Sequence, residues 1–426
     1  MRRDKRQTDG MEKITSLRGF RDISGEEAEK FVRIEQISRT VFELSGFREI
    51  GIPILEKTEL FKRSIGDTTD IVEKEMFTFI DRNGDSLTLR PEATAGIVRH
   101  YLQEGLHARE RISRLFTIGP MFRHERPQKG RFRQFHQVDV EVFGAAEPIV
   151  DAELLWIIAR ILGQLAVKRY AIELNSVGCK ECRAPFREVL VSYFSEKKES
   201  LCPDCQNRLI RNPLRIFDCK SQACIDLTKE SPLLFDHLCE NCRVHFETLL
   251  SYLAGFGIDP VVNKRLVRGL DYYTRTVFEV TSQELGAQKA FLAGGRYDNL
   301  VEDMGGPSAP GIGFAIGIER LALLMDSSQI VRKPRYFLAL IGDKTVACRI
   351  PIIKALAEND IPVSYSPDPK SLKSQMRHAD SIGADYAMIL GEGEMEKGVI
   401  LVRNMKSGNQ AELPLDITSL ADKLSR

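Results

Sequence analysis

The stretch from Gly119 to Gly144 constrains the fold of this chain most strongly, because it combines two strand-like segments with a basic loop between them. Within the second segment, residues 134–143 alternate between two faces, which is typical of a β-strand with different surroundings on its two sides. One face carries Phe135, Gln137, Asp139, Glu141 and Phe143, and the other is rich in valine. A water-soluble protein normally turns such phenylalanines toward a core or a pocket, so the polar groups among them predict a binding site. The alternative is a surface hairpin with solvated charges.

The loop between these strands is rich in cations, and Pro127 and Gly130 favour a loop over a helix. Its cations are Arg123, Arg126, Lys129, Arg131 and Arg133. Such a loop can hold several positive charges over a pocket floored by the sheet. We therefore expect a polyanion to bind here, beside the carboxylates of the strand.

The length of 426 residues predicts two or three domains. The 61 Lys and Arg residues balance 60 Asp and Glu residues, so any binding of nucleic acid must come from local patches rather than from bulk charge. No apolar run approaches the ~18 residues of a membrane span, and the N-terminus lacks the apolar segment of a secretory signal. We therefore expect a cytoplasmic protein without a membrane partner. Residues 1–10 are predicted to be a disordered extension, with Met11 as an alternative start.

The segment before the basic hairpin predicts a helix followed by an edge strand. Ser24 and Glu27 have the spacing of a capping box, and the helix that they begin is expected to end at Gly46. Residues 47–52 then predict a strand that ends at Pro53. Because proline is confined to strand ends and edges, this strand is expected at a sheet edge, which a second subunit can cover.

Three further stretches present polar residues at the ends of expected elements. A hairpin with an Asn83–Gly84 turn leads to the sequence TLRPEAT. Residues 293–298, AGGRYD, predict a glycine-rich turn. Residues 311–325 predict a strand that runs into a helix with Arg320 in its opening turns, where an arginine can bind a phosphate. The alternative for these glycines is simple tight packing of strand and helix.

Eight of the nine cysteines lie between Cys179 and Cys242. In chain order they are Cys179, Cys182, Cys202, Cys205, Cys219, Cys224, Cys239 and Cys242. The first four have the spacing of a four-cysteine zinc site, and the last four look like a less regular copy. We expect structural zinc in this module, with the pairing of the knuckles left open; the alternative is a set of buried reduced cysteines. The module, residues 179–261, is expected to be a helical insertion between strands of the first domain.

The last part of the chain, residues 333–426, predicts a separate α/β domain with a mixed sheet, because strand-like and helix-like segments alternate there.

Several of these motifs resemble those of a known enzyme family. FRHE, the basic loop and FHQVDVE resemble motif 2 of the class II aminoacyl-tRNA synthetases, GIGFAIGIERL resembles motif 3, and the helix and strand before Pro53 resemble motif 1. RGLDYYTRTVFE and AGGRYD resemble signatures of the histidyl-tRNA synthetases, as does TLRPEAT, in which Ala93 stands for the usual glycine. The resemblance extends from Arg18 into the C-terminal domain, whereas the cysteine-rich insertion is not general in that family.

The resemblance implies an α+β fold. A class II catalytic domain with an antiparallel sheet would comprise residues 11–178 and 262–328, and residues 333–426 would form the anticodon-binding domain. It also implies a homodimer that activates L-histidine with ATP and Mg²⁺, releases pyrophosphate and transfers histidine from histidyl-adenylate to the 3′ end of tRNA-His. Since the histidine carboxylate arrives already ionised, the first step needs alignment and neutralisation of charge rather than a base. No DNA partner is implied.

The resemblance also assigns roles to residues of this chain. The implied ATP-binding residues are Arg123, Glu125, Arg131, Phe135 and Arg320. The implied histidine-binding residues are Glu92, Thr94, Gln137, Glu141, Arg268, Tyr272, Tyr273 and Tyr297. Arg123 and Arg268 would stabilise charge at the α-phosphate, and Arg126 and Gln128 would read the extra 5′ guanosine of tRNA-His.

Two other functions fit parts of the sequence. One is the non-catalytic paralogue that senses histidine as a regulatory subunit of ATP phosphoribosyltransferase. The presence of Arg123, Arg268 and Arg320, and of the C-terminal domain, counts against it. The other is a zinc-dependent nucleic-acid-binding protein without enzymatic activity, which the balanced charge disfavours.

Overall fold

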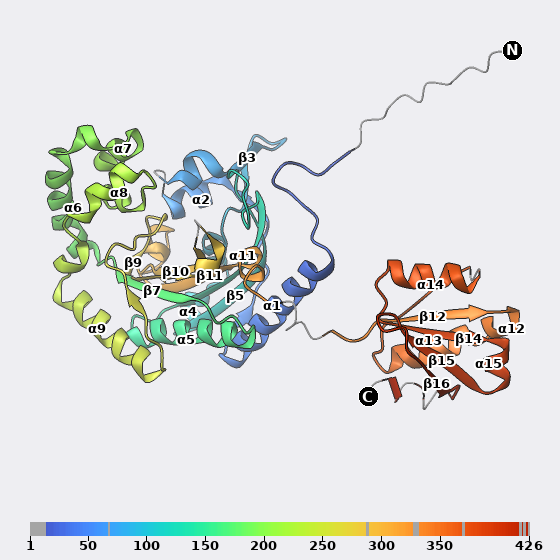
Figure 1. Cartoon of the computed structure of the whole chain (residues 1–426). Coiled ribbons are helices and arrows are strands. Elements are labelled where there is room, and N and C mark those ends of the chain that lie inside the picture. Colours follow the sequence, from blue (N-terminus) through green and yellow to red (C-terminus); the bar gives the residue numbers. More distant parts are fainter. Residues whose placement is uncertain are drawn as a thin grey trace, which may run out of the picture. The chain divides into compact units, whose positions relative to one another are not determined.

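The computed structural model of the chain describes residues 14–66, 69–286, 289–326, 332–368, 371–416, 420 and 423–424. It divides into two units, residues 1–330 and 331–426, which we describe separately (Figure 1). The extension predicted for residues 1–10 lies outside the described residues. Within the described part of the chain, no helix combines the length and apolarity needed to cross a membrane.

The first unit is built on an eight-stranded sheet with the strand order β1-β5-β6-β11-β10-β9-β7-β8. Its strands are β1 (Arg48–Glu49), β5 (Ser113–Phe122), β6 (Gln134–Phe143), β7 (Ala171–Ser176), β8 (Val261–Val262), β9 (Thr274–Thr281), β10 (Ala290–Arg296) and β11 (Gly311–Gly317). The pairs from β5 to β7 are antiparallel, and only the outermost pairs, β1 with β5 and β7 with β8, are parallel among the described strands. The expected antiparallel catalytic sheet is therefore confirmed, with β1 at its edge.

One face of this sheet is covered by helices and holds an apolar core. The helices that pack there are α1 (Gly25–Leu44), α5 (Pro148–Gln164), α9 (Glu240–Gly255) and α11 (Ile318–Ala322). Val138, Val140 and Val142 of β6 are fully buried in this core. Because side chains alternate along a strand, Gln137, Asp139 and Glu141 must then lie on the opposite face, as the alternation predicts.

The opposite face is bordered by a small sheet and short helices. The small sheet has the order β2-β4-β3, with β2 (Leu55–Lys57), β3 (Phe77–Ile80) and β4 (Ser86–Leu89). Around it lie α2 (Thr58–Ile65), the π-helix η1 (Ile71–Glu75), α3 (Thr94–Gln103), α4 (Leu106–Arg109) and α10 (Leu300–Asp303), and the 3₁₀ helix η5 (Gln283–Leu285) follows β9. This arrangement leaves room for a cavity over the sheet.

The cysteine-rich segment is inserted between β7 and β8, which pair with each other. It is helical, as expected, and Figure 1 shows α6, α7 and α8 grouped beside the sheet. Its elements are α6 (Lys180–Ser195), η2 (Lys198–Ser200), α7 (Pro203–Arg211), η3 (Pro213–Asp218), α8 (Gln222–Lys229), η4 (Leu234–His237) and α9. The insertion therefore begins and ends at one edge of the sheet.

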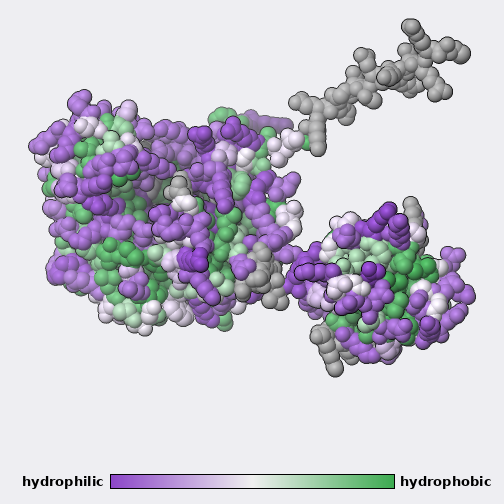
Figure 2. Space-filling model, in the orientation of Figure 1, coloured by the Kyte–Doolittle hydropathy of each residue, from purple (hydrophilic) through white to green (hydrophobic). Residues whose placement is uncertain are grey.

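The second unit has a five-stranded mixed sheet with the order β13-β12-β14-β15-β16. Its strands are β12 (Tyr336–Ile341), β13 (Val363–Tyr365), β14 (Tyr386–Gly391), β15 (Val399–Asn404) and β16 (Gln410–Pro414). The helices are α12 (Asp343–Val346), α13 (Arg349–Glu358), α14 (Leu372–Ser381) and α15 (Glu392–Glu396). The mixed sheet confirms the α/β domain expected for this part of the chain. Figure 2 shows that hydrophilic residues dominate the visible surface of each unit.

Three local predictions differ from the structure. Ser24 precedes α1 but makes no side-chain capping bond, because the Glu27 carboxylate pairs with Arg21 instead. The AGGRYD stretch is not a turn, since its first four residues form the end of β10. A Cβ at Gly294 would lie only 2.6 Å from the Phe278 ring, so glycine is required there for close strand packing. The strand expected over residues 47–52 is shorter than predicted and is confined to β1.

Candidate active site

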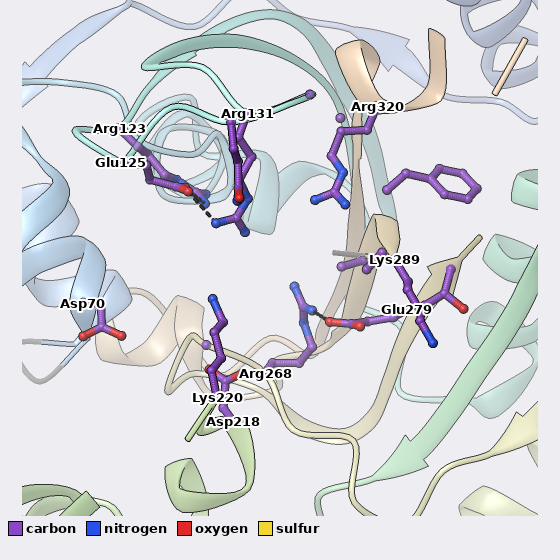
Figure 3. A pocket seen from close by; sticks show the side chains of 18 of the residues that line it. Asp70, Arg123, Glu125, Arg131, Asp218, Lys220, Arg268, Glu279, Lys289 and Arg320 are labelled. Carbon is purple, nitrogen blue, oxygen red and sulfur yellow. Dashed lines mark hydrogen bonds and ion pairs between the residues drawn. The ribbon is translucent and has the colours of Figure 1, made fainter. Parts of the chain in front are cut away.

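A cavity of about 1240 Å³ lies over the sheet of the first unit. Its lining comes from the β5–β6 hairpin, strands β9 to β11, the start of α11 and the insertion. The cations among its lining residues are Arg123, Arg131, Arg208, Lys220, Arg268, Lys289 and Arg320. Figure 3 shows Arg268 and Lys220 extending into the cavity from one side and Arg131 and Arg320 from the other. This arrangement of positive charge around an open volume suits a polyphosphate.

The β5–β6 hairpin supplies one wall of the cavity. Arg123 is anchored by its Nε, which donates a hydrogen bond of 2.8 Å to the Pro91 carbonyl, and its guanidinium lies 5.3 Å from the centre of the Phe135 ring. Glu125 accepts a hydrogen bond of 2.6 Å from Arg131. A cation therefore lies beside the half-buried ring of Phe135, which lines the cavity, and this arrangement can bind a flat base together with its phosphates.

Arg320 extends into the same cavity from α11. Burial, and next the repulsion from Arg131, lower the pKa of Arg320 to about 10. The helix that carries it is fixed to β6, because Glu319 accepts hydrogen bonds from the backbone and the ring of His136 at 2.9 to 3.0 Å. The repulsion between Arg131 and Arg320 is relieved when an anion binds between them, so this part of the cavity favours an anionic ligand.

Arg268 lies between the cavity and a deeper group of buried side chains. It forms an ion pair with Glu279 of β9, and its guanidinium lies 5.9 Å from the centre of the Tyr273 ring. Its buried Nε has no hydrogen-bond partner within the part of the chain that the structure describes. Arg268 also lines the cavity, so its guanidinium group can contact a ligand there.

The deeper group is centred on Glu141 of β6. This carboxylate accepts hydrogen bonds from the Thr94 hydroxyl at 2.7 Å and from the Tyr297 hydroxyl. The rings of Tyr272 and Tyr273 lie 4.7 Å apart, and Tyr272 also packs edge-on against Tyr297. Burial raises the pKa of Glu141 to about 8, although both hydroxyls act to lower it. Side chains of these types, grouped together, can recognise a polar aromatic ring.

The other residues predicted to bind histidine lie around this group. Glu92 accepts hydrogen bonds from the backbone N–H groups of Thr94 and Ala95 at 2.7 and 3.0 Å, so it caps the start of α3. Gln137 lines the cavity, and its buried Oε1 has no hydrogen-bond partner among the described residues. These acceptors suit an ammonium group of a ligand.

Three further residues of the site were given no role from the sequence. Asp139 lies between Gln137 and Glu141 on the same face of β6, is 2% exposed, and has a pKa raised well above its usual value by burial. The alternation of β6 was the available signal for it. Asp218 and Lys220 of the insertion also line the cavity. The sequence assigned a role only to the cysteines beside them.

The two residues assigned to the tRNA acceptor lie at the exposed tip of the hairpin. The backbones of Gln128 and Arg131 form an isolated bridge that closes the tip. Gln128 lines the cavity rim, whereas Arg126 is exposed and is not part of the lining.

The eight cysteines of the insertion come together in two groups of four. The outer group is Cys179, Cys182, Cys239 and Cys242, and the inner group is Cys202, Cys205, Cys219 and Cys224. Within each group all sulfur atoms lie within 4.8 Å of one another, and measured pairs are 3.7 to 3.8 Å apart. An ion held by four thiolates at about 2.3 Å in tetrahedral geometry places its ligands about 3.8 Å apart, so both groups fit zinc. The first cysteine pair in the sequence thus combines with the last pair to form the outer group. The two middle pairs combine to form the inner group.

Comparison with known proteins agrees with these features. A model of the histidyl-tRNA synthetase family matches residues 19–182 and 227–321, and a model of an anticodon binding domain matches residues 337–426. A histidine–tRNA ligase of Trichlorobacter lovleyi is 47% identical over 96% of this chain and 97% of its own length. One of Geobacter sulfurreducens is 45% identical over 97% of this chain and 100% of its own length.

A solved structure extends the similarity to three dimensions. The crystal structure of apo histidyl-tRNA synthetase from S. aureus superposes with a TM-score of 0.79 at 33% identity, covering 97% of this chain and 100% of that one. The similarity therefore includes both units and the sheet that carries the cavity. On its sequence, its fold and the geometry of its site, the chain belongs to the histidyl-tRNA synthetase family.

Proposed function

We propose that this chain is an enzyme that activates L-histidine with ATP and transfers the histidyl group to the 3′ end of tRNA-His. The observation that carries the proposal is the position of the buried Glu141 cluster on the same face of β6 as Gln137, which lines the cavity that also contains the arginines. A pocket for a polar ring next to a site for a polyphosphate is what the first reaction requires.

In that reaction an oxygen of the histidine carboxylate attacks the α-phosphorus of ATP. The new bond joins carboxylate and phosphate, and the bond to the β-phosphate breaks, so that pyrophosphate leaves with the electron pair. Negative charge grows on the α-phosphate during this step. Arg123 and Arg268 neutralise it, and Arg320 holds the terminal phosphate; these positions agree with their places around the cavity.

The base of ATP stacks on Phe135, and Glu125 accepts hydrogen bonds from the adenine side. Arg131, which pairs with Glu125, completes the ATP site. The carboxylate of Glu279 lines the same cavity, and it would supply an oxygen ligand of the kind that Mg²⁺ prefers. When bound with ATP, Mg²⁺ spreads the negative charge of the phosphates.

Histidine occupies the deeper pocket. Glu92, Thr94 and Gln137 hold its α-amino group. Glu141 and Tyr273 bind the two imidazole nitrogens, and Tyr272 and Tyr297 line the pocket. Because the pocket presents buried polar groups to both nitrogens, an apolar analogue would leave those groups unpaired and be rejected by ~10⁴ or more.

Further partners follow from the rest of the chain. Arg126 and Gln128 read the 5′ end of tRNA-His, and the C-terminal unit binds its anticodon. The insertion holds two structural zinc ions. A homodimer forms over the sheet edge at β1, both residues of which are exposed. The enzyme works in the cytoplasm, where its substrates are found.

Charging of tRNA tests the proposal. Purified protein is incubated with labelled histidine, ATP and tRNA, and acid-insoluble histidyl-tRNA is measured. Charging of tRNA-His, and of no other tRNA, is expected. Folded protein that binds histidine without charging any tRNA would instead fit a regulatory, non-catalytic subunit.

A further inference from the structure

The two four-cysteine groups differ in their position relative to the active-site cavity. Cys202 and Cys219 of the inner group line the cavity, together with Asp218, Lys220 and Ser221. None of the outer cysteines belongs to that lining. The inner group therefore forms part of the active-site wall, and the outer group closes the base of the insertion beside β7.

The inner group has features that favour a bound metal ion over simple burial. Cys205 and Cys224 are fully buried, whereas Cys202 and Cys219 are partly exposed. The backbone N–H groups of Cys202 and Ser221 approach the sulfurs of Cys224 and Cys219 at 3.3 and 3.4 Å. Such N–H···S contacts stabilise thiolates, which are the form of cysteine that binds zinc.

The segment between the two inner cysteine pairs contacts the catalytic part of the unit. Arg208 and Arg215 approach Asp70 at 3.4 and 3.5 Å. Arg211 pairs with Glu73 at 2.7 Å. In addition, Asn212 donates a hydrogen bond of 2.8 Å to Asp271, next to the Tyr272–Tyr273 pair. An ion that joins both ends of this segment holds these contacts in place.

Lys220 directly follows a cysteine of the inner group and extends into the cavity. Figure 3 shows its side chain directed toward the arginines on the opposite side. Arg131 and Arg268 each have a carboxylate partner within the cavity. By contrast, no acidic side chain pairs with Lys220 among the described residues. A lysine in this position, exposed at the cavity wall, offers a positive charge to a phosphate that enters the cavity.

We propose that a zinc ion in the inner group fixes the Asp218–Ser221 turn as a wall of the active site, and that Lys220 binds a phosphate from that turn. This inference rests on the proposed synthetase function. The phosphate belongs either to the triphosphate of ATP or to the 3′-terminal nucleotide of the tRNA, since both must enter this cavity. The chemistry is the same, and kinetics distinguish the two sources.

The test compares Lys220→Ala, Lys220→Arg and Lys229→Ala. Lys229 is a matched control, because it lies on the same insertion and pairs with Asp226 outside the cavity. ATP–pyrophosphate exchange gives KM for ATP, and charging gives KM for tRNA. If the phosphate is that of ATP, Lys220→Ala raises KM for ATP roughly tenfold with little change in kcat. If it is that of tRNA, exchange is unchanged and KM for tRNA rises by a similar factor. Lys220→Arg restores most of the loss in either case.

Metal analysis of the same samples tests the role of the ion. The inner variant Cys219→Ser is expected to lose one zinc per chain and to raise the same KM as Lys220→Ala. A wild-type protein without zinc at the inner group, or a Lys220→Ala protein that matches Lys229→Ala in both KM values, overturns the inference. If Cys219→Ser does not fold, the zinc content of the wild type still tests the metal site, and the Lys220 variants still test the binding of phosphate. Failure of the wild type to catalyse histidine-dependent exchange would instead defeat the proposed function.

Discussion

The Thr94 hydroxyl donates a hydrogen bond of 2.7 Å to the Glu141 carboxylate, although the two residues are 47 positions apart in the chain. This bond joins the first residue of α3 to the middle of β6. It places a buried carboxylate at the end of the pocket that we assign to the imidazole ring.

Replacement of Glu141 by glutamine is expected to weaken histidine binding selectively. Leaving a buried hydrogen-bonding group of the imidazole without its partner costs about 1–3 kcal/mol, so KM for histidine should rise roughly 5- to 100-fold. Because Glu141 does not line the phosphate cavity, KM for ATP should change little. Exchange measured at varied histidine and at varied ATP checks this, and equal rises in both constants would contradict the assignment.

The same residue predicts a pH dependence of stability. Burial raises the pKa of Glu141 to about 8 from its usual 4.5. A carboxyl with a higher pKa in the folded state takes up a proton on folding between these values, so the folded state loses stability as pH rises through them. Glu141→Gln removes this loss. Unfolding of ligand-free protein at several pH values should show the variant gaining on wild type from about pH 4.5 to 8 and levelling off above. A constant difference would show that Glu141 does not titrate in this way.

Arg268 is predicted to act mainly in the transition state. Removal of one group that stabilises developing charge typically costs ~10²–10³ in kcat, and Arg268→Ala should show a loss of this order in exchange. Arg265→Ala is a suitable control, because Arg265 bonds the backbone of Thr228 instead of lining the cavity. Similar activities of the two variants would remove Arg268 from the mechanism.

The pairing of the cysteines predicts a specific pattern of zinc loss. Cys182 and Cys242 belong to one group, whereas Cys182 and Cys205 belong to different groups. The double variant Cys182→Ser/Cys242→Ser should therefore keep one zinc per chain, and Cys182→Ser/Cys205→Ser should leave neither group complete. Pairing in sequence order predicts the reverse, so metal analysis of the two proteins separates the alternatives.

Gly313 is expected to be indispensable for the packing around Glu141. A Cβ at this position would overlap both the Glu141 carboxylate and the Val140 carbonyl, whereas at Gly317 on the same strand the nearest atom is 3.6 Å away. Overpacking of this kind costs about 1–3 kcal/mol, so Gly313→Ala should lower Tm by several degrees more than Gly317→Ala. Equal Tm values would show that β6 and β11 can move apart at no cost.

Much of the catalytic sheet could be predicted because its strands carry clear periodic signals. The alternation along β6 separates the valines of the core from Gln137 and Glu141, and the glycine-rich β11 runs into α11 as expected. Propensity failed where tertiary contacts dominate. Glycine disfavours strands, yet Gly294 lies within β10 because its neighbours leave no space for a side chain.

Other features depend on contacts between segments that are distant in the chain, and the spacing of residues in the sequence does not predict such contacts. The spacing of the cysteines is compatible with pairing in sequence order, but the helices of the insertion bring the first and last pairs together. Likewise, nothing around Lys220 in the sequence indicates that its side chain extends into the cavity. The position of Lys220 depends on how the insertion packs against the rest of the unit, where Arg208 and Arg215 approach Asp70.

The most direct test of the account is amino-acid-dependent ATP–pyrophosphate exchange by the purified wild-type protein. With each of the common amino acids supplied in turn, the Glu141 pocket predicts exchange with histidine alone. Exchange with a different amino acid, or none from folded protein supplied with ATP, Mg²⁺ and histidine, would contradict the central claim.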